Sequence, residues 1–304
     1  MRIRPLQLQE WDHLAEFIHR STNAWYDRNL GRSIFPEPPA ICRIFPETYE
    51  ALDPGCCLIA EDEDSGVWMG SCFFHPRPTH VSVGIINTAP QCASRGVAKA
   101  LIQAVLDRAG PLPVRLVSSA LNLDSYSLYS RLGFTPRELF QDMLWQVPLE
   151  GPDNPPPGTD RIRPAQPGDL EAICTLDHEL TGIRREKDFH HLLLNPGGVW
   201  RLLVSPDGAG RIEGFLASVD HPGSCMLGPG CSLNTACALA LIWRQWQFFP
   251  GKSPVFLVPA SQSALISQLY RRGARNCELH LLQVLGDSTP LKGIVMPSFL
   301  PETL

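Results

Sequence analysis

The stretch of sequence that decides the fold runs from Val81 to Phe134 and reads VSVGIINTAPQCASRGVAKALIQAVLDRAGPLPVRLVSSALNLDSYSLYSRLGF. Residues 81–88 form an apolar run of strand length. Apolar side chains then recur at helical spacing between Val97 and Leu106, and Gly110-Pro111 ends that helix. A second apolar strand, Val114 to Val117, follows. The stretch therefore predicts a strand, a loop, a helix and a second strand.

The loop before the predicted helix is made of small residues, Ala93-Ser94-Arg95-Gly96. The N–H groups of a first helical turn have no intrahelical partner, and with the helix dipole they attract anions. Gly96 has no Cβ, so a phosphate can approach the backbone closely there. We therefore predict a phosphate site at the start of this helix.

Two segments of this stretch resemble the acetyl-CoA-binding core of the GNAT N-acetyltransferase superfamily. That family carries Gln/Arg-x-x-Gly-x-Gly/Ala between its fourth strand and third helix, and residues 93–98 (Ala-Ser-Arg-Gly-Val-Ala) match it except at Ala93. Residues 122–134 resemble the family's Asn…Ala…Leu-Tyr-x-x-Leu-Gly-Phe segment, with Ser125 at the position of the alanine. The two matches occur in the family's order and at its spacing.

Length and composition describe an ordinary globular protein. The chain has 304 residues, which suits two domains, with 44% hydrophobic and 19% charged residues. A net charge of −5 argues against a nucleic-acid-binding protein. Neither a membrane-spanning run nor the apolar core of a signal peptide is present, so we expect a cytoplasmic protein without a membrane role.

The ten cysteines do not form a metal-binding pattern. None belongs to a Cys-x-x-Cys pair, and Cys225, Cys231 and Cys237 are six residues apart with no histidine in register. We interpret them as small buried apolar residues in a reducing compartment and expect no metal.

An internal repeat indicates two copies of one fold. Arg2-Ile3-Arg4-Pro5 opens the chain, and Arg161-Ile162-Arg163-Pro164 repeats it. Residues 151–158 are rich in proline and read as a linker. We therefore expect an α+β (mixed α/β) protein with a GNAT domain in residues 1–150 and a degenerate GNAT-like domain in residues 159–304. The resemblance implies that each has a mixed, mostly antiparallel sheet flanked by helices.

In the first copy we expect a helix over residues 9–19 and a separate helical or looped piece over residues 21–31. The expected strands are residues 57–61, 67–74, 80–88, 114–119, 134–138 and 142–147. A short helix is expected over residues 124–132.

The second copy lacks the cofactor loop. Leu233-Asn234-Thr235-Ala236 stands where the first copy has Gly96, and it contains neither glycine nor a basic residue. Gly228-Pro229-Gly230 is interpreted as a turn. We therefore expect no second CoA site. Residues 177–185 resemble an Asp…Thr-Gly-x-x-Arg segment of tandem GNAT proteins, and a capped helix boundary at Gly182 explains that segment equally well.

The GNAT resemblance implies a set of acetyl-CoA-binding residues. Residues 86–88 would lie along the pantetheine and acetyl group, residues 93–98 would hold the pyrophosphate with charge from Arg95 and Lys99, and Asn122 would bind the pantetheine. The implied set is Ile86, Asn87, Thr88, Ala93, Ser94, Arg95, Gly96, Val97, Ala98, Lys99 and Asn122.

The same resemblance assigns catalytic and acceptor-binding residues. Tyr129 matches the tyrosine that faces the CoA sulfur and protonates it, although a packing role under the sheet is the alternative. Residues 79–88 contain no carboxylate, so the candidate bases are His80 and, after it, His75. Trp25 and Tyr26, in the loop expected after the first helix, would shape the acceptor site or form a packing cap.

The predicted function is acetyl-CoA-dependent transfer of an acetyl group to a primary amine by direct attack, on a small-molecule or peptide acceptor. Two alternatives remain: an acetyl-CoA-binding sensor or scaffold without turnover, and a transferase for a different acyl group. A monomer or a homodimer is expected, and the sequence does not identify the acceptor.

Overall fold

The computed structural model describes residues 1–304, which form two compact units. The first unit contains residues Met1–Val114, His221–Gly223 and Phe299–Thr303. The second contains Arg115–Asp220, Ser224–Ser298 and Leu304. Both units combine helices with strands, as the α+β prediction requires.

The first unit is built on four antiparallel strands that are neighbours in chain order. They are β1 (Arg2–Pro5), β2 (Cys57–Glu61), β3 (Trp68–Pro76) and β4 (Val81–Thr88). Its helices are α1 (Trp11–Leu30), α2 (Ile44–Leu52) and α3 (Val97–Ala109).

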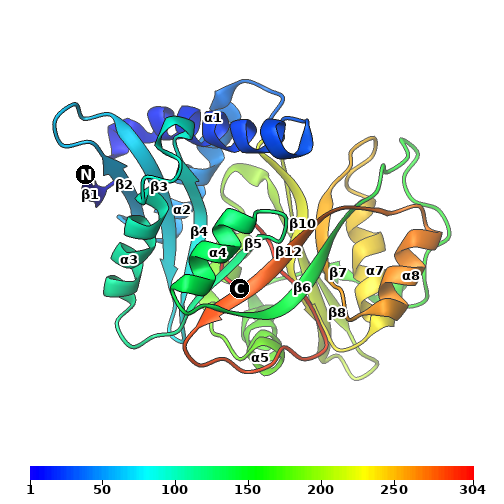
Figure 1. The fold of residues 1–304 in the computed structure, drawn as a ribbon. Helices are drawn as coiled ribbons and strands as arrows, with labels where there is room; N and C mark the ends of the chain where they lie inside the picture. Colours follow the sequence, from blue (N-terminus) through cyan, green and yellow to red (C-terminus); the bar gives the residue numbers. More distant parts are fainter. The chain divides into compact units, whose positions relative to one another are not determined.

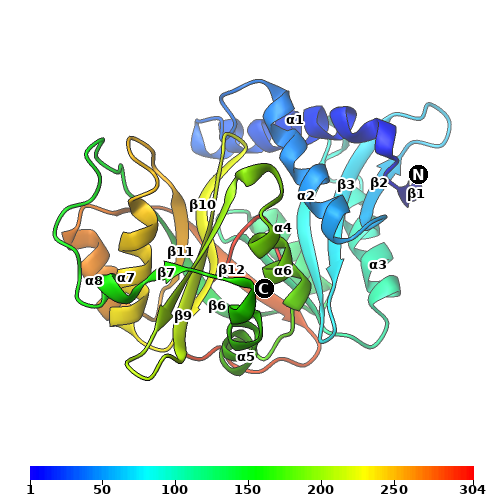
Figure 2. The same ribbon diagram turned by 180° about the vertical axis from the view of Figure 1, so that it is seen from behind.

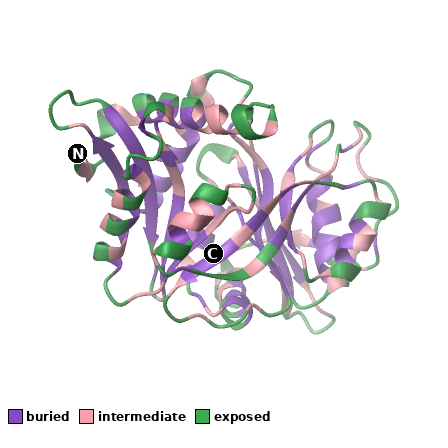
Figure 3. Cartoon of the chain, in the orientation of Figure 1, coloured by how far each residue is buried: buried purple, intermediate pink, exposed green.

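The helices of this unit cover both faces of its sheet (Figure 1, Figure 2). A Cβ at Gly70 of β3 would lie 2.7 Å from Val97 Cγ1 of α3. Phe73, which points to the other face, packs against Tyr49 of α2 with ring centroids 4.6 Å apart. Because both faces are covered, β2, β3 and most of β4 are buried (Figure 3).

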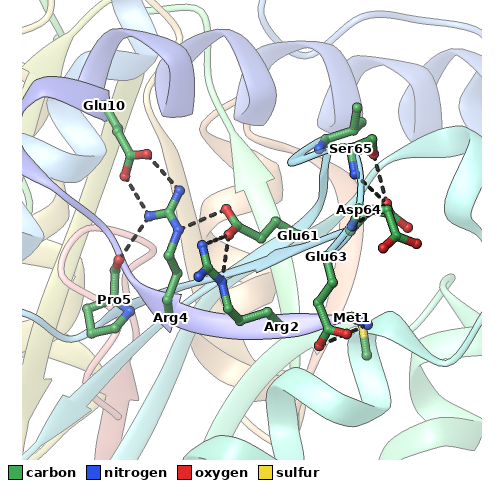
Figure 4. A network of polar contacts seen from close by, with 11 residues as sticks. Met1, Arg2, Arg4, Pro5, Glu10, Glu61, Glu63, Asp64 and Ser65 are labelled. Atoms are coloured by element: carbon green, nitrogen blue, oxygen red, sulfur yellow. Dashed lines mark hydrogen bonds and ion pairs between the residues drawn. The ribbon is translucent and has the colours of Figure 1, made fainter.

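Ion pairs fix the start of the chain to this sheet (Figure 4), and a capping box follows β1. Arg4 donates to Glu10 at 2.7 and 2.8 Å and to Glu61 at 2.8 Å, and Arg2 also pairs with Glu61. Glu10 in turn accepts from the backbone N–H of Gln7 at 2.9 Å. The Arg4 guanidinium holds the pKa of Glu10 below its usual value.

The same combination of an arginine ion pair and a capping box appears where the Arg-x-Arg-Pro sequence is repeated. Arg163 donates to both carboxylate oxygens of Asp169 at 2.7 and 2.8 Å, and the Gln166 N–H donates to Asp169 at 2.7 Å. The repeated Arg-Pro strand is thus followed by a capped turn in both copies. This supports the interpretation of the chain as a duplication.

The second unit contains most of the remaining elements. Its helices are α4 (Leu123–Arg131), α5 (Leu170–Thr181), α6 (Glu186–Leu194), α7 (Thr235–Trp246) and α8 (Ser263–Arg271). Its strands are β5 (Val114–Ser119), β6 (Thr135–Leu144), β7 (Arg163–Pro164), β8 (Trp200–Pro206), β9 (Ile212–His221), β10 (Ser224–Ser232), β11 (Val255–Pro259), β12 (Arg275–Leu285) and β13 (Ile294–Met296).

The two copies exchange their last strands within this second unit. The order of elements from β1 to β6 is repeated from β7 to β12. However, β6 lies between β11 and β12 and pairs antiparallel with both, while β12 is the neighbour of β5. Each copy therefore contributes its last strand beside the strands of the other copy, so the compact units do not follow the sequential halves.

Two element predictions for the first copy were wrong. Residues 11–30 form one helix rather than two pieces, because Ser21 Oγ donates back to the Phe17 carbonyl at 2.6 Å without interrupting the helix. The helix ends only at Gly31, in the left-handed conformation (φ 66°). Residues 135–144 form one strand, β6, rather than two, because it has continuous partners on both sides.

The predicted turn at Gly228-Pro229-Gly230 was also wrong, because these residues lie inside β10. A Cβ at Gly230 would lie 2.5 Å from Leu216 Cδ1 and 2.9 Å from the Phe215 carbonyl oxygen. Gly230 therefore lets β10 pack closely against the neighbouring strand β9, and it does not reverse the direction of the chain.

All ten cysteines are free thiols, and six of them are buried. Burial raises the pKa of the Cys42 and Cys237 thiols to about 12, which keeps these thiols protonated near neutral pH. None of the helices combines the length and the apolar character needed to cross a lipid bilayer.

Candidate functional site

The predicted cofactor loop is an exposed turn between β4 and α3. A short 3-10 helix (Pro90–Cys92) follows β4, and the turn residues 93–96 are all exposed. Ser94 (φ 62°) and Gly96 (φ 78°) both have left-handed backbone conformations. Successive turns of this kind direct backbone N–H groups outward into an anion-binding concavity. The local sequence therefore produces the geometry that the phosphate prediction requires.

The N-terminus of α3 is open. Gly96 is its cap residue and supplies no side-chain hydrogen bond, so the N–H groups of Val97, Ala98 and Lys99 point out of the helix without an internal partner. A Cβ at Gly96 would meet no atom within 4 Å. The residues present therefore fit a phosphate-bearing cofactor such as CoA, with positive charge from the exposed Arg95 and Lys99.

The corresponding helix of the second copy is closed. The Asn234 side chain caps α7 by accepting a hydrogen bond from the Cys237 N–H at 2.9 Å. One of the amides that an anion would use is thus already occupied. The contrast with Gly96 agrees with the expectation of no second CoA site.

The predicted pantetheine-binding residues lie at the end of β4. Asn87 is buried and donates through its side-chain amide to Thr22 Oγ1 of α1 at 3.0 Å, whereas Ile86 and Thr88 are half-buried. The β3–β4 pairing has a bulge just before these residues, where the pairs shift from Phe74–Val83 to Cys72–Ile86. Bulges re-aim the strand that carries them, and they are frequent beside active sites.

Trp25 and Tyr26 do not lie in a loop, as predicted, but on the second half of α1. The loop was expected because residues 21–31 were predicted as a separate helical or looped piece, whereas residues 11–30 form one continuous helix. Both rings are half-buried and meet edge to face, with centroids 5.0 Å apart.

The two candidate histidines have structural partners. His80 is buried, donates from Nε2 to the Thr303 carbonyl at 2.8 Å, and places Nδ1 3.1 Å from Thr79 Oγ1. His75 is also buried, with Nδ1 2.8 Å from Asp53 Oδ2. Both His80 ring nitrogens are thus engaged, so this geometry does not favour His80 as the catalytic base.

Asn122 and Tyr129 belong to the second unit. Asn122 Oδ1 accepts from the Ser125 N–H at 3.1 Å and caps α4, which leaves the side-chain N–H groups as its donors. Tyr129 is 3% exposed and packs against Phe134, with ring centroids 5.9 Å apart. Both predicted roles therefore remain proposals.

Sequence reasoning missed a buried polar cluster in the first unit. Arg77 Nη1 lies 3.0 Å from both oxygens of Asp53, which also contacts His75. Glu302 lies close by, and burial raises the pKa of its carboxyl well above the usual range, partly offset by a hydrogen bond with Tyr49. The cluster combines three separate segments, around residues 49–53, 75–77 and 302, so no single local motif could have identified it.

Comparison with known proteins agrees with this architecture. Residues 17–134 match the sequence model of the acetyltransferase (GNAT) family. A search of curated proteins found no match. Because the matched segment contains β4, the loop and α3, it includes the whole predicted cofactor site of the first unit.

Solved structures of similar fold cover nearly the whole chain. A proposed acetyltransferase from Pyrococcus horikoshii superposes with a TM-score of 0.74 at 16% identity, over 98% of this chain and 95% of the other. A tandem GNAT protein from the clavulanic acid biosynthesis pathway gives 0.61 at 11% identity, over 95% and 99%. N-myristoyltransferase from Saccharomyces cerevisiae gives 0.64 at 10% identity, over 96% and 81%.

At identities of 10–16%, the structural matches establish only the fold. Evidence about the activity comes from the family match. The family match supports acetyl transfer in general. The chain therefore has the fold of tandem GNAT proteins, and its residues 17–134 match the acetyltransferase (GNAT) family.

Proposed function

We propose that this protein is an acetyl-CoA-dependent N-acetyltransferase that acts on a primary amine of a small molecule or peptide. The observation that carries the proposal is the open N-terminus of α3 behind the turn at Ser94 and Gly96. This anion-binding geometry lies inside the segment that matches the family. The closed N-terminus of α7 supports a single site, in the first copy.

The chain's own residues would hold the cofactor in two parts. The backbone N–H groups of residues 94–99 would bind the pyrophosphate, with Arg95 and Lys99 adding charge. Residues 86–88 at the end of β4 would lie along the acyl end, and Asn122 would donate its side-chain amide to the pantetheine. When bound, acetyl-CoA supplies the acetyl group as a reactive thioester.

The reaction forms a bond between the amine nitrogen and the acetyl carbon. The carbon–sulfur bond breaks with its electron pair remaining on sulfur, which takes up one proton. For an acceptor that starts as an ammonium ion, one further proton is released to solvent. Tyr129 remains the proposed donor of the proton to sulfur, because it matches the family's tyrosine. Trp25 and Tyr26 are proposed to shape the acceptor site from α1.

Tyr129→Phe should lower kcat by roughly a hundredfold or more, the size expected for loss of a positioned proton donor. The Kd for acetyl-CoA should change by less than about threefold, since the phenol hydroxyl contributes to proton transfer rather than to cofactor holding. Thiol release from acetyl-CoA would be followed with putrescine, glucosamine, kanamycin and a free tripeptide as acceptors.

Tyr126→Phe is the matched control, because it makes the same change on the same helix. Its kcat should stay near the wild-type value. Acetyl-CoA binding by the wild type without acetylation of any of these amines would contradict the proposal and favour a cofactor-binding sensor or scaffold. Equal kcat values for wild type and Tyr129→Phe would remove Tyr129 from the mechanism.

A further inference from the structure

Gly84 lies in the middle of β4. Because it has no side chain, the side chains of other residues can approach its α-carbon closely. A Cβ atom on Gly84 would lie 2.8 Å from His75 Nε2 and 3.3 Å from Glu302 Oε2. The missing side chain therefore lets the Glu302 carboxylate lie directly against β4. This strand has no carboxylate of its own.

The segment Phe299–Thr303 that carries Glu302 is fixed at both ends within the first unit. The Tyr49 hydroxyl donates to the Phe299 carbonyl at 2.6 Å. The His80 ring donates to the Thr303 carbonyl at 2.8 Å. Two buried side chains of α2 and the β4 region thus set the position of Glu302, which gives His80 a structural purpose.

The Glu302 carboxylate has no cationic partner. Glu302 as a residue is half-buried, but its carboxyl group is enclosed and Oε2 makes no hydrogen bond. The nearby cations are already paired, because Arg77 and His75 both contact Asp53. A buried carboxylate without a cation is costly, and it is normally retained where a ligand or a reaction uses it.

Further oxygen atoms without hydrogen-bond partners lie on the same face of β4. Ser82 Oγ is two residues before Gly84, and Asn87 Oδ1 lies beyond the bulge. Glu302 Oε2 lies at Gly84, and Ser82 is the next residue on this face of the strand, so these two oxygens can accept hydrogen bonds beside each other. A primary ammonium group has three donors and no acceptor, so it complements such oxygens.

We propose that Glu302 is the general base for the acceptor amine, an inference that rests on the proposed function. The carboxylate binds the acceptor's ammonium group and removes one proton. An N–H bond breaks, its electron pair stays on nitrogen, and an O–H bond forms on Glu302. The neutral amine then attacks, and Glu302 later releases the proton to water.

The location suits this role. Gly84 is two residues before Ile86, which corresponds to at most about 7 Å along the strand, because the bulge between Val83 and Ile86 shortens it. Residues 86–88 are those proposed to hold the acyl end of the cofactor. An amine bound at Glu302 would therefore lie within the length of one side chain of the group it attacks.

Glu302→Gln removes the base and keeps the shape of the side chain. We expect kcat/KM for the best acceptor of the amine panel to fall by at least about a hundredfold at pH 7.5. The Kd for acetyl-CoA should stay within about twofold. The wild type should lose activity at acid pH as Glu302 is protonated, whereas the residual activity of Glu302→Gln should lack that acid limb. The deficit should shrink towards pH 10, where the acceptor amine is neutral without assistance.

Glu50→Gln is the matched control, because Glu50 is another glutamate of the same unit whose pKa is raised by burial. It should retain wild-type kcat/KM. Glu302→Asp should be slower than wild type but keep the acid limb, because it retains a carboxylate set back by one methylene group. Wild-type activity and an unchanged acid limb in Glu302→Gln would overturn the inference alone. An inactive wild type that binds acetyl-CoA would overturn both the inference and the proposed function.

Thermal unfolding gives a readout that does not depend on turnover. Because the pKa of Glu302 is raised in the folded state, wild-type stability should fall as pH rises through that raised pKa. The groups that face Glu302 are Tyr49 of α2 and His75 of β3, with Asp53, Arg77 and His80 behind them, and all remain in the variant. Glu302→Gln should therefore gain Tm relative to wild type at pH 9 but not at pH 4. A Tm difference that is the same at both pH values would contradict an ionising buried carboxylate.

Discussion

Gly96→Glu should weaken acetyl-CoA binding by at least about a hundredfold, or roughly 2.7 kcal/mol. The new carboxylate would stand at the open N-terminus of α3, where a Cβ meets no atom within 4 Å. It would occupy the N–H groups meant for the pyrophosphate and would repel its negative charge. Calorimetry of the purified variant measures the loss directly.

The control for this variant is Gly66→Glu. Gly66 has a similar left-handed backbone (φ +68°, against +78° at Gly96), and its Cβ position is also free of atoms within 4 Å. Both variants therefore carry the same backbone penalty, of about 1–2 kcal/mol in stability. Gly66→Glu should bind acetyl-CoA normally. An equal loss of binding in the two variants would show that strain, rather than the anion site, explains the effect.

Arg185→Met should lower the free energy of unfolding by about 3–5 kcal/mol, because it leaves the buried Asp177 carboxylate without its counter-ion. Each side chain is 1% exposed, and Arg185 donates to Asp177 at 2.7 and 2.9 Å. Burial alone would lower the pKa of Arg185, but Asp177, with smaller contributions from Cys231 and Asp188, raises it overall. Urea denaturation followed by tryptophan fluorescence measures the change.

The double variant Asp177→Leu with Arg185→Met tests the reason for that loss. Replacing both charges by apolar side chains removes the unpaired carboxylate, so most of the lost stability should return. A double variant as unstable as Arg185→Met alone would contradict the ion-pair explanation. This pair also accounts for the Thr181-Gly182 segment, since Gly182 ends α5 in the left-handed conformation (φ 73°) and so brings Arg185 back to Asp177.

The sequence predicted the cofactor half of the site because its signals are local. β4, α3 and β5 occupy the predicted ranges, since Gly96 and Gly110 mark the two ends of α3. The open N-terminus of α3 follows from the same glycine. Such features depend on a few adjacent residues and need no knowledge of the rest of the chain.

Features that depend on distant residues were not predictable. Gly230 looked like a turn residue, and only its contact with Leu216 shows why a strand needs glycine there. The exchange of β6 and β12 depends on pairing between segments far apart in the chain. Glu302 reaches β4 for a similar reason, because the space it fills is created by Gly84 at a remote position. The sequence shows that β4 has no carboxylate of its own, but it does not show that the Glu302 carboxylate lies against this strand.

Calorimetric titration of the full chain with acetyl-CoA tests the central claim most directly. The claim is that one CoA site exists, at the open N-terminus of α3, while the Asn234 cap closes the equivalent position of α7. We predict one equivalent bound per chain, and we expect Gly96→Glu to lose it. Two equivalents in the wild type, or no binding at all, would contradict the account.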